Sequence, residues 1–217
     1  KLKLGILFGG QSGEHEVSLM SAASVMNVID RSKYDIIPIG ITKQGHWKLY
    51  FGDTSKIIDG SWEEESVPAL VTPDPNFKCI MVIDDGKEIR YHLDVVFPVL
   101  HGPRGEDGTI QSIFELMNIP YVGCGVTSSA LCMDKVFAKM ILQQSGLPVV
   151  DFKVYFKDEL ADNMPNIITE IIDTLGLPCF VKPANLGSSV GISKVEKEDE
   201  LEAALNFAAK YDYKILV

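Results

Sequence analysis

Residues 2–41 begin with the mostly apolar run Leu2-Lys3-Leu4-Gly5-Ile6-Leu7-Phe8, which leads into the turn Gly9-Gly10-Gln11-Ser12-Gly13-Glu14. The apolar run has the length and composition of a buried strand. Apolar residues then recur at helical spacing from Val17 to Ile29, and Ile36 to Ile41 is a second strand-like run. The order strand, loop, helix, strand predicts a βαβ unit in a parallel sheet. Such a sheet binds ligands beyond the carboxyl ends of its strands.

Further elements follow along the first half of the chain. Residues 42–75 carry both Trp residues and scattered Gly without clear periodicity, so we predict a solvated insertion there. The turn Asp84-Asp85-Gly86 between two apolar runs predicts a hairpin. A buried strand is predicted over 94–100 and a helix over 109–117.

A glycine-bearing turn at Tyr121-Val122-Gly123-Cys124-Gly125 predicts a domain boundary. We therefore expect an α/β fold with a parallel-sheet domain over 1–123 and a compact α+β domain over 124–217. The second domain is predicted to contain helices over 128–133, 135–145, 167–175 and 199–211, and strands over 149–155, 179–182, 191–195 and 214–217.

Composition excludes several classes of protein. The 217 residues include 20 Lys plus Arg against 30 Asp plus Glu, which gives a formal charge of −10 and argues against nucleic-acid binding. No apolar run approaches the roughly 18 residues that a membrane-spanning helix needs. The four Cys match neither a zinc site nor a CxxC redox pair, so we expect reduced thiols in a cytoplasmic protein. Because the chain lacks an initiator Met and stops on a predicted strand, we expect it to be truncated.

The turn at Gly9 to Glu14 lies at a helix N-terminus, where backbone N–H groups favour anionic ligand groups. It is neither a Walker loop nor a GxGxxG fingerprint. Glu14 could bind an ammonium group, because a partly buried carboxylate needs a cationic partner. The alternative interpretation is a glycine-rich turn whose carboxylates complement the helix N-terminus.

The loop His101-Gly102-Pro103-Arg104-Gly105-Glu106-Asp107-Gly108 directly follows the strand predicted over 94–100. Loops on a rigid scaffold carry functional groups, and four ionisable side chains interleave here with Gly and Pro. The alternative is that His101 is a hydrogen-bonded structural residue. We favour a functional role.

A third stretch, Lys182-Pro183-Ala184-Asn185-Leu186-Gly187-Ser188-Ser189-Val190-Gly191, joins two predicted strands. An ammonium, two hydroxyls and flexible backbone amides suit phosphate oxygens, whereas the alternative is an ordinary hairpin. In Met133-Asp134-Lys135, the pattern predicts Asp134 as a helix N-cap and Lys135 as a surface residue unless another part of the chain places it.

Taken together and in this order, the four stretches resemble the D-alanine–D-alanine ligases of the ATP-grasp superfamily. The resemblance covers essentially all 217 residues but only the first two of the family's three domains. It implies a pre-ATP-grasp, Rossmann-like N-terminal domain and a central ATP-grasp domain, with the C-terminal ATP-grasp domain absent.

The resemblance also implies a reaction. The carboxylate of one D-alanine attacks the γ-phosphate of ATP, and the amine of a second D-alanine displaces phosphate from the resulting acylphosphate. Glu14 would bind the ammonium of the first D-alanine, and His101 would lie beside its carboxylate or acylphosphate. Ser188 would join Glu14 in the catalytic network. The ATP phosphates would be held by Lys135, Lys182 and Ser189.

Other implications concern cofactors and cellular role. The family uses Mg²⁺, with Mn²⁺ as an alternative, and its metal ligands and adenine-binding residues are expected beyond Val217, so we expect the 217 residues alone to be inactive. Such ligases are cytoplasmic enzymes of peptidoglycan biosynthesis, cell-wall biogenesis and cell shape. Their partners are small molecules, with no nucleic acid and no membrane. Dimers are common in the family, and the sequence does not fix the oligomeric state.

Two alternatives stay open. One is a resistance-type ligase that uses D-serine or D-lactate as the second substrate, since such enzymes share these motifs. The other is a binding module without turnover, which we disfavour because the motif residues Glu14, His101, Lys135, Lys182 and Ser188 are all present.

Overall fold

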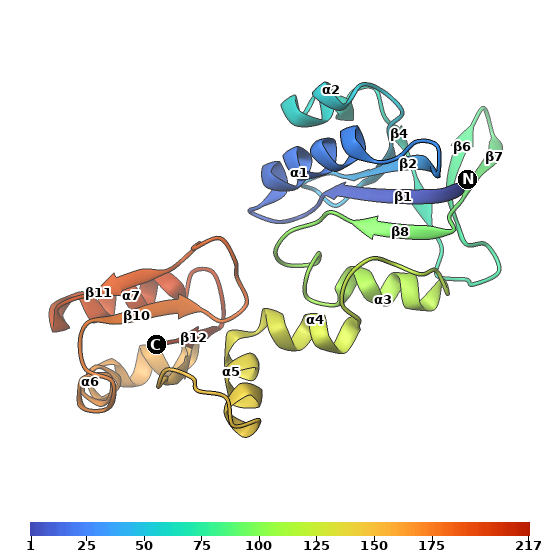
Figure 1. Cartoon of the computed structure of the whole chain (residues 1–217). Helices are drawn as coiled ribbons and strands as arrows, with labels where there is room; N and C mark the ends of the chain where they lie inside the picture. The colour runs from blue at the N-terminus through green and yellow to red at the C-terminus, as the bar shows by residue number, and fades with distance from the viewer. The chain divides into compact units, whose positions relative to one another are not determined.

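The computed structural model describes residues 1–217 and divides into two compact units, Lys1–Ala130 and Leu131–Val217 (Figure 1). The division falls inside helix α4 (Val126–Met133), shortly after the boundary predicted at residues 123 and 124. Each unit has its own hydrophobic core.

The first unit is built on a five-stranded sheet with the order β4-β3-β2-β1-β8. Its strands are β1 (Leu2–Gly9), β2 (Tyr34–Ile41), β3 (Trp47–Leu49), β4 (Val67–Pro68) and β8 (Val95–Pro98). Strand β1 pairs in parallel with both β2 and β8, which confirms the predicted parallel core. The edge strands β3 and β4 are antiparallel additions.

Helices cover both faces of this sheet (Figure 1). Alternate side chains of β1, Leu4, Ile6 and Phe8, join one core cluster with α1 (His15–Val28) and α2 (Thr54–Asp59). Leu7 points the other way, into a cluster with α3 (Thr109–Leu116). A strand that is buried on both faces has one continuous apolar run, which is why residues 4–8 signalled the fold; Leu2 and Lys3, at the start of the strand, are exposed.

The prediction of a solvated insertion over 42–75 is wrong. The segment contains β3, α2, the 3-10 helix η1 (Ser61–Glu63), β4 and β5 (Leu70–Val71), and the Tyr50 and Trp62 side chains are fully buried. Trp62 packs edge-on against Phe8 and lies directly over Gly40, where any Cβ would collide with the indole ring. Elements of two to six residues are too short to show a hydrophobic period, so the sequence pattern missed them.

The predicted hairpin is confirmed. Strands β6 (Cys79–Asp84) and β7 (Lys87–His92) pair antiparallel, and β5 completes a three-stranded sheet. Asp85 and Gly86 both have positive φ, 46° and 73°, as a type I′ turn requires.

The second unit holds an antiparallel four-stranded sheet with the order β11-β10-β12-β9, in agreement with the predicted α+β organisation. Helices α6 and α7 contact each other and pack on the sheet through one core cluster. The elements of this unit are α5 (Lys135–Gln144), β9 (Val154–Phe156), α6 (Lys157–Thr174), β10 (Cys179–Pro183), β11 (Ser193–Val195), η2 (Glu198–Glu200), α7 (Leu201–Ala208) and β12 (Lys214–Leu216).

Two elements of the second unit differ from the prediction. The strand expected over 149–155 is formed only at β9, and Val150 is 80% exposed. The helix expected over 167–175 begins ten residues earlier, at Lys157, with a break at Asn163 where φ is −139°. Pro165 follows this break and so lies in the first turn of the second helical piece, a position that tolerates proline. None of the helices has the length and apolar character that crossing a membrane would require.

Candidate functional site

The glycine-rich turn of the first unit follows β1 directly. Gly9 and Gly10 have φ of 86° and 98°, conformations that favour glycine, and the Gly10 N–H donates to the Ile41 carbonyl at 2.7 Å. Glu14 is the N-cap of α1, and its own N–H donates to Ser12 Oγ at 3.1 Å. The turn therefore places the Glu14 carboxylate at the carboxyl edge of the parallel sheet, as predicted from the sequence.

The His101 loop is held rigid by its own carboxylates. Glu106 Oε2 accepts from the Gly102 N–H at 2.7 Å, and Asp107 accepts from the N–H groups of Arg104 at 2.7 Å and Thr109 at 3.0 Å. Burial raises the pKa of Asp107, but these hydrogen bonds outweigh it and hold the pKa below its ordinary value. Asp107 is thus an ionised carboxylate that joins the loop to the start of α3.

The structure brings these two loops together. A Cβ placed on Gly102 would lie 2.5 Å from Glu14 Oε2 and 2.7 Å from Ser12 Oγ, so only glycine allows this approach. The Arg104 guanidinium donates to Gln11 Oε1, which links the loops a second time. Residues of both loops also line a cavity of about 150 Å³. Glu14 and the loop that begins at His101 form one site on the first unit.

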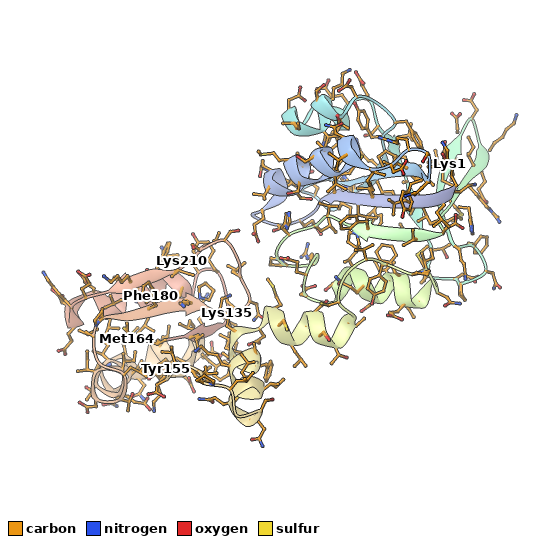
Figure 2. The ribbon with its side chains drawn as sticks, in the orientation of Figure 1. Lys1, Lys135, Tyr155, Met164, Phe180 and Lys210 are labelled. Carbon is orange, nitrogen blue, oxygen red and sulfur yellow. The ribbon has the colours of Figure 1, made fainter.

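In the second unit, Lys135 is the first residue of α5 (Figure 2). Its ammonium group donates to the Leu186 carbonyl and lies 3.4 Å from the Ala184 carbonyl, both in the loop after β10. The fold brings the distant 184–186 backbone to the helix start, so Lys135 is placed by these carbonyls and is half-buried. Lys135 therefore connects α5 to the beginning of the loop between β10 and β11, residues 184–192, which contains Ser188 and Ser189 and is called the serine-rich loop.

Asp134 is the N-cap that the sequence predicted. Its Oδ1 accepts from the N–H groups of Val136 at 2.9 Å and Phe137 at 3.2 Å, and its Oδ2 accepts from Lys214 Nζ at 2.5 Å. Burial raises the pKa of Asp134, but Lys214 and the two amides lower it more, so the net pKa lies below its ordinary value. Asp134 thereby fixes the direction in which α5 leaves the loop.

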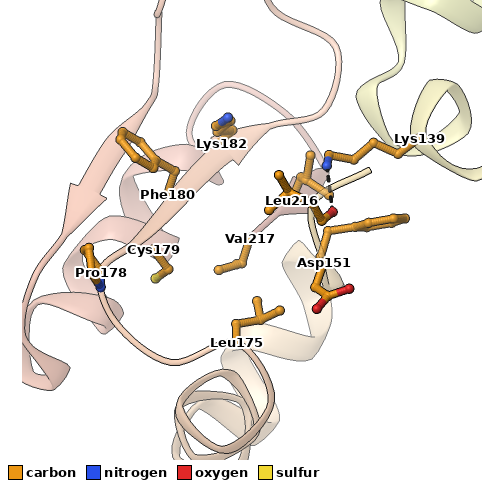
Figure 3. Close-up of a pocket in the computed structure, with 11 residues that line it drawn as sticks. Lys139, Asp151, Leu175, Pro178, Cys179, Phe180, Lys182, Leu216 and Val217 are labelled. Carbon is orange, nitrogen blue, oxygen red and sulfur yellow. Dashed lines mark hydrogen bonds between the residues drawn. The ribbon is translucent and has the colours of Figure 1, made fainter. Parts of the chain in front are cut away.

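Lys182 lies on β10 and lines a cavity of about 430 Å³ (Figure 3). Its ammonium lies 5.4 Å from the centroid of the Phe180 ring, within cation–π range. The other lining residues are mostly apolar, with Lys139 and Asp151 as the further charged groups. A partly apolar cavity with ammonium groups at its wall suits a flat ring joined to an anionic chain.

Lys139 is a candidate that sequence reasoning missed. It lies on α5 and donates to the Val150 carbonyl at 3.0 Å, with its ammonium 5.1 Å from the Phe152 ring centroid (Figure 3). Burial, and then the positive charge of Lys182, lower the pKa of Lys139. The sequence carried a signal, because Lys135 and Lys139 are four residues apart and so share a helix face.

The serine-rich loop adopts an unusual backbone. Ser188 and Ser189 are exposed with positive φ of 46° and 61°, a conformation that costs non-glycine residues energy and recurs at ligand-binding loops. Gly191 has φ of 72°, and a Cβ there would lie 2.6 Å from Pro183 Cγ. The expected link between Ser188 and Glu14 joins residues of different units and stays a prediction.

The described residues 1–217 hold no group of three or more His, Cys, Asp or Glu side chains that could bind a metal ion. The donor set in this chain therefore does not by itself fit Mg²⁺. All four cysteines are free thiols. Burial raises the pKa of Cys79 and of Cys179, so both are held as neutral thiols.

Comparison with known proteins agrees with these features. The family described as D-ala D-ala ligase N-terminus matches residues 3–124, and the one described as D-ala D-ala ligase C-terminus matches residues 141–217. Proteins named D-alanine–D-alanine ligase from Thermoanaerobacter sp. (strain X514) and Clostridium acetobutylicum are 57% and 49% identical over the whole chain. The chain spans about 60% of the length of these curated relatives.

Solved structures give the same result. The VanG D-Ala:D-Ser ligase from Enterococcus faecalis matches with a TM-score of 0.88 and 41% identity, over 100% of this chain and 62% of that one. The D-alanine–D-alanine ligase from Coxiella burnetii matches with a TM-score of 0.86 and 35% identity, over 100% of this chain and 63% of that one. From its sequence motifs, its fold and these relatives, the chain belongs to the D-alanine–D-alanine ligase family.

Proposed function

We propose that the enzyme to which these residues belong joins two D-alanines to D-alanyl-D-alanine at the expense of ATP. The observation that carries the proposal is the convergence of the Glu14 turn and the His101 loop at the carboxyl edge of the parallel sheet. A carboxylate and an imidazole held there suit a small zwitterion, whose ammonium and carboxylate need opposite partners.

The proposed reaction has two steps. A carboxylate oxygen of the first D-alanine attacks the γ-phosphorus of ATP, and the bond to the ADP oxygen breaks. The amine of the second D-alanine then attacks the acyl carbon, loses a proton and expels phosphate. The products are ADP, phosphate and the dipeptide, which we propose is made in the cytoplasm for peptidoglycan.

Within this reaction, Glu14 binds the ammonium of the first D-alanine and His101 lies beside its carboxylate. Ser188 joins the network with Glu14. We further propose that residues 1–123 form a pre-ATP-grasp domain and that residues 124–217 form a central ATP-grasp domain.

The second unit supplies the proposed ATP site. Lys182 and Lys139 line the same cavity as the apolar side chains of Phe180 and Val217, which can contact a nucleobase, while the residues that recognise adenine are still expected beyond Val217. Lys135 and Ser189 would hold phosphate oxygens once the serine-rich loop closes over them. Phosphoryl transfer depends mainly on such positioning and charge neutralisation.

Binding of ATP to the 217-residue chain tests this site by calorimetry. We expect Lys182→Ala to weaken binding and Lys194→Ala to leave it unchanged, because Lys194 is an exposed residue of β11 that pairs with Glu196. Equal effects of the two substitutions would contradict the assignment of Lys182.

Mg²⁺ does not fit the donor set of these residues, so we assign it no step here. We propose that its ligands lie elsewhere in the enzyme and that the 217 residues alone do not turn over. Release of phosphate from ATP that depends on D-alanine, measured with this chain alone, would refute this.

A second candidate is ligation of D-alanine to D-serine. The similarity to the VanG D-Ala:D-Ser ligase favours it specifically. Product analysis of the whole ligase, supplied with D-alanine, D-serine and D-lactate in competition, separates the two. A dipeptide of D-alanine alone supports the main proposal, whereas a mixed product supports the alternative.

A further inference from the structure

Two serine hydroxyls of α1, those of Ser18 and Ser21, contact the chain at or just after the end of β8. Glu14, Ser18 and Ser21 are spaced by four and three residues, so they lie on one side of the helix. Ser18 is fully buried, accepts from the Gly9 N–H at 2.8 Å and donates to the Val99 carbonyl. One hydroxyl thus joins the ends of β1 and β8, from which the two site loops depart.

Ser21 lies one turn further along the same face. Its Oγ is 3.2 Å from His101 Nε2, and both residues are half-buried. A hydroxyl can donate to a ring nitrogen or accept from it, and this choice sets which nitrogen of a neutral imidazole carries the proton. Ser18 bonds the carbonyl of Val99, two residues before His101. This bond between α1 and the end of β8 therefore also keeps His101 close to Ser21.

We propose that Ser21 is a positioning residue for His101, and that its hydroxyl donates to Nε2 and keeps the imidazole proton on Nδ1. The argument for the direction rests on the proposed function. A histidine beside a carboxylate or acylphosphate must offer an N–H to the anionic oxygen, and Nε2 is already engaged with Ser21. Nδ1 is therefore the nitrogen that can donate to the substrate.

The tautomer of His101 can be measured without any ligase activity. Two-bond ¹H–¹⁵N spectra of the 217-residue chain, at a pH where the ring is neutral, distinguish Nδ1–H from Nε2–H imidazoles, and His101→Gln assigns the signal. We expect Nδ1–H in the parent chain and a shift to Nε2–H or a mixture in Ser21→Ala. His15 is an internal standard, because its Nδ1 must donate to the Gly10 carbonyl at 2.8 Å.

Ser24→Ala is the matched control. Ser24 lies one turn beyond Ser21 on the same helix, is exposed, and its hydroxyl donates only to the Met20 carbonyl of that helix. It should leave the His101 signals unchanged. Nε2–H in the parent chain, an unchanged tautomer in Ser21→Ala, or the same change in Ser24→Ala would each overturn the proposal.

Kinetics of the whole ligase then test the consequence for the substrate. Loss of one hydrogen bond predicts a fall of about 2- to 12-fold in kcat/KM for D-alanine in Ser21→Ala, with little change for ATP. Ser21→Thr keeps the hydroxyl and should restore the value. If the tautomer changes as expected while the parent enzyme makes no dipeptide, the proposed function fails and the positioning role stands.

Discussion

Removal of the Asp134 carboxylate should destabilise the second unit more than any change to a surface ion pair. Asp134 is 6% exposed, caps α5 through two N–H groups and pairs with Lys214 at 2.5 Å. Asp134→Ala leaves those amides without their cap and Lys214 without its counter-ion. Asp134→Asn keeps the cap, since Asn is a good N-cap residue, and removes only the charge.

The magnitudes follow from these contacts. Breaking a buried ion pair costs about 3–5 kcal/mol, and losing an N-cap costs about 1 kcal/mol. The Lys214 side chain keeps 17% exposure and its ammonium lies 4.2 Å from the Phe137 ring centroid, so the lower figure applies to the pair. We therefore expect losses in the free energy of unfolding of about 4 kcal/mol for Asp134→Ala and about 3 kcal/mol for Asp134→Asn.

Urea unfolding followed by circular dichroism measures these values. The control is Glu196→Gln, which breaks the exposed Lys194–Glu196 pair and should cost under about 1 kcal/mol. A loss in Asp134→Asn equal to that in Asp134→Ala would show that the cap contributes nothing. A loss no larger than that of the control would refute the reasoning about the buried pair.

The stability contributed by the Asp134–Lys214 pair should decrease as the solution becomes acidic. Because the folded-state pKa of Asp134 is lowered, the pair contributes stability above the unfolded pKa of about 3.9, and this is lost as pH falls through the folded pKa. Lys214→Met removes the main charge partner, so its stability should fall less steeply below about pH 4 than that of the parent chain. If plots of unfolding free energy against pH run parallel for the parent chain and Lys214→Met, Lys214 is not the charge partner that lowers the pKa of Asp134.

Three further predictions concern the site and its loops. In the whole ligase, Lys182→Ala should raise the KM for ATP about tenfold or more while Lys194→Ala does not, because a point charge on a phosphate contributes about 1.5–3 kcal/mol. Glu14→Gln should mainly raise the KM for the first D-alanine, and steady-state kinetics with both substrates varied would contradict the role of Glu14 if the KM for ATP rose instead. Gly191→Ala should cost about 2–5 kcal/mol, since crowding of about 1–3 kcal/mol adds to the backbone strain, whereas Gly60→Ala, at φ 84° in open space, should cost only the strain of about 1–2 kcal/mol. Equal losses in urea unfolding would show that crowding at Gly191 is negligible.

The sequence predicted the parts of the fold whose signals are local. The run at residues 4–8 carries no charged or polar side chain because this part of β1 is buried on both faces, and the Asp85-Gly86 turn requires two positive φ values. The insertion at 42–75 could not be predicted in the same way. The burial of Trp62 depends on the bare Gly40 backbone in another strand, which is a contact between positions far apart in the chain.

In the site, too, features with a local sequence signal could be predicted, whereas contacts between distant positions of the chain could not. The Glu14 turn and the His101 loop could be found because each follows an apolar strand. Their mutual contact through Gly102, and the Ser21 contact with His101, depend on which strands are neighbours in the sheet. Lys139 had a visible spacing to Lys135, but only the packing of α5 shows that it shares a cavity with Lys182.

The acidic charge of the chain gives the lysines of this cavity a specific consequence. With a formal charge of −10, the protein supplies no general attraction for a polyphosphate. Burial, and second the repulsion from the positive charge of Lys182, lower the pKa of Lys139. A bound polyphosphate would relieve this repulsion and raise the pKa of Lys139. The affinity for nucleotide, measured against pH, should therefore fall as pH rises through the pKa of Lys139 in the free protein. This fall should disappear in Lys139→Arg, because arginine keeps its charge throughout this range.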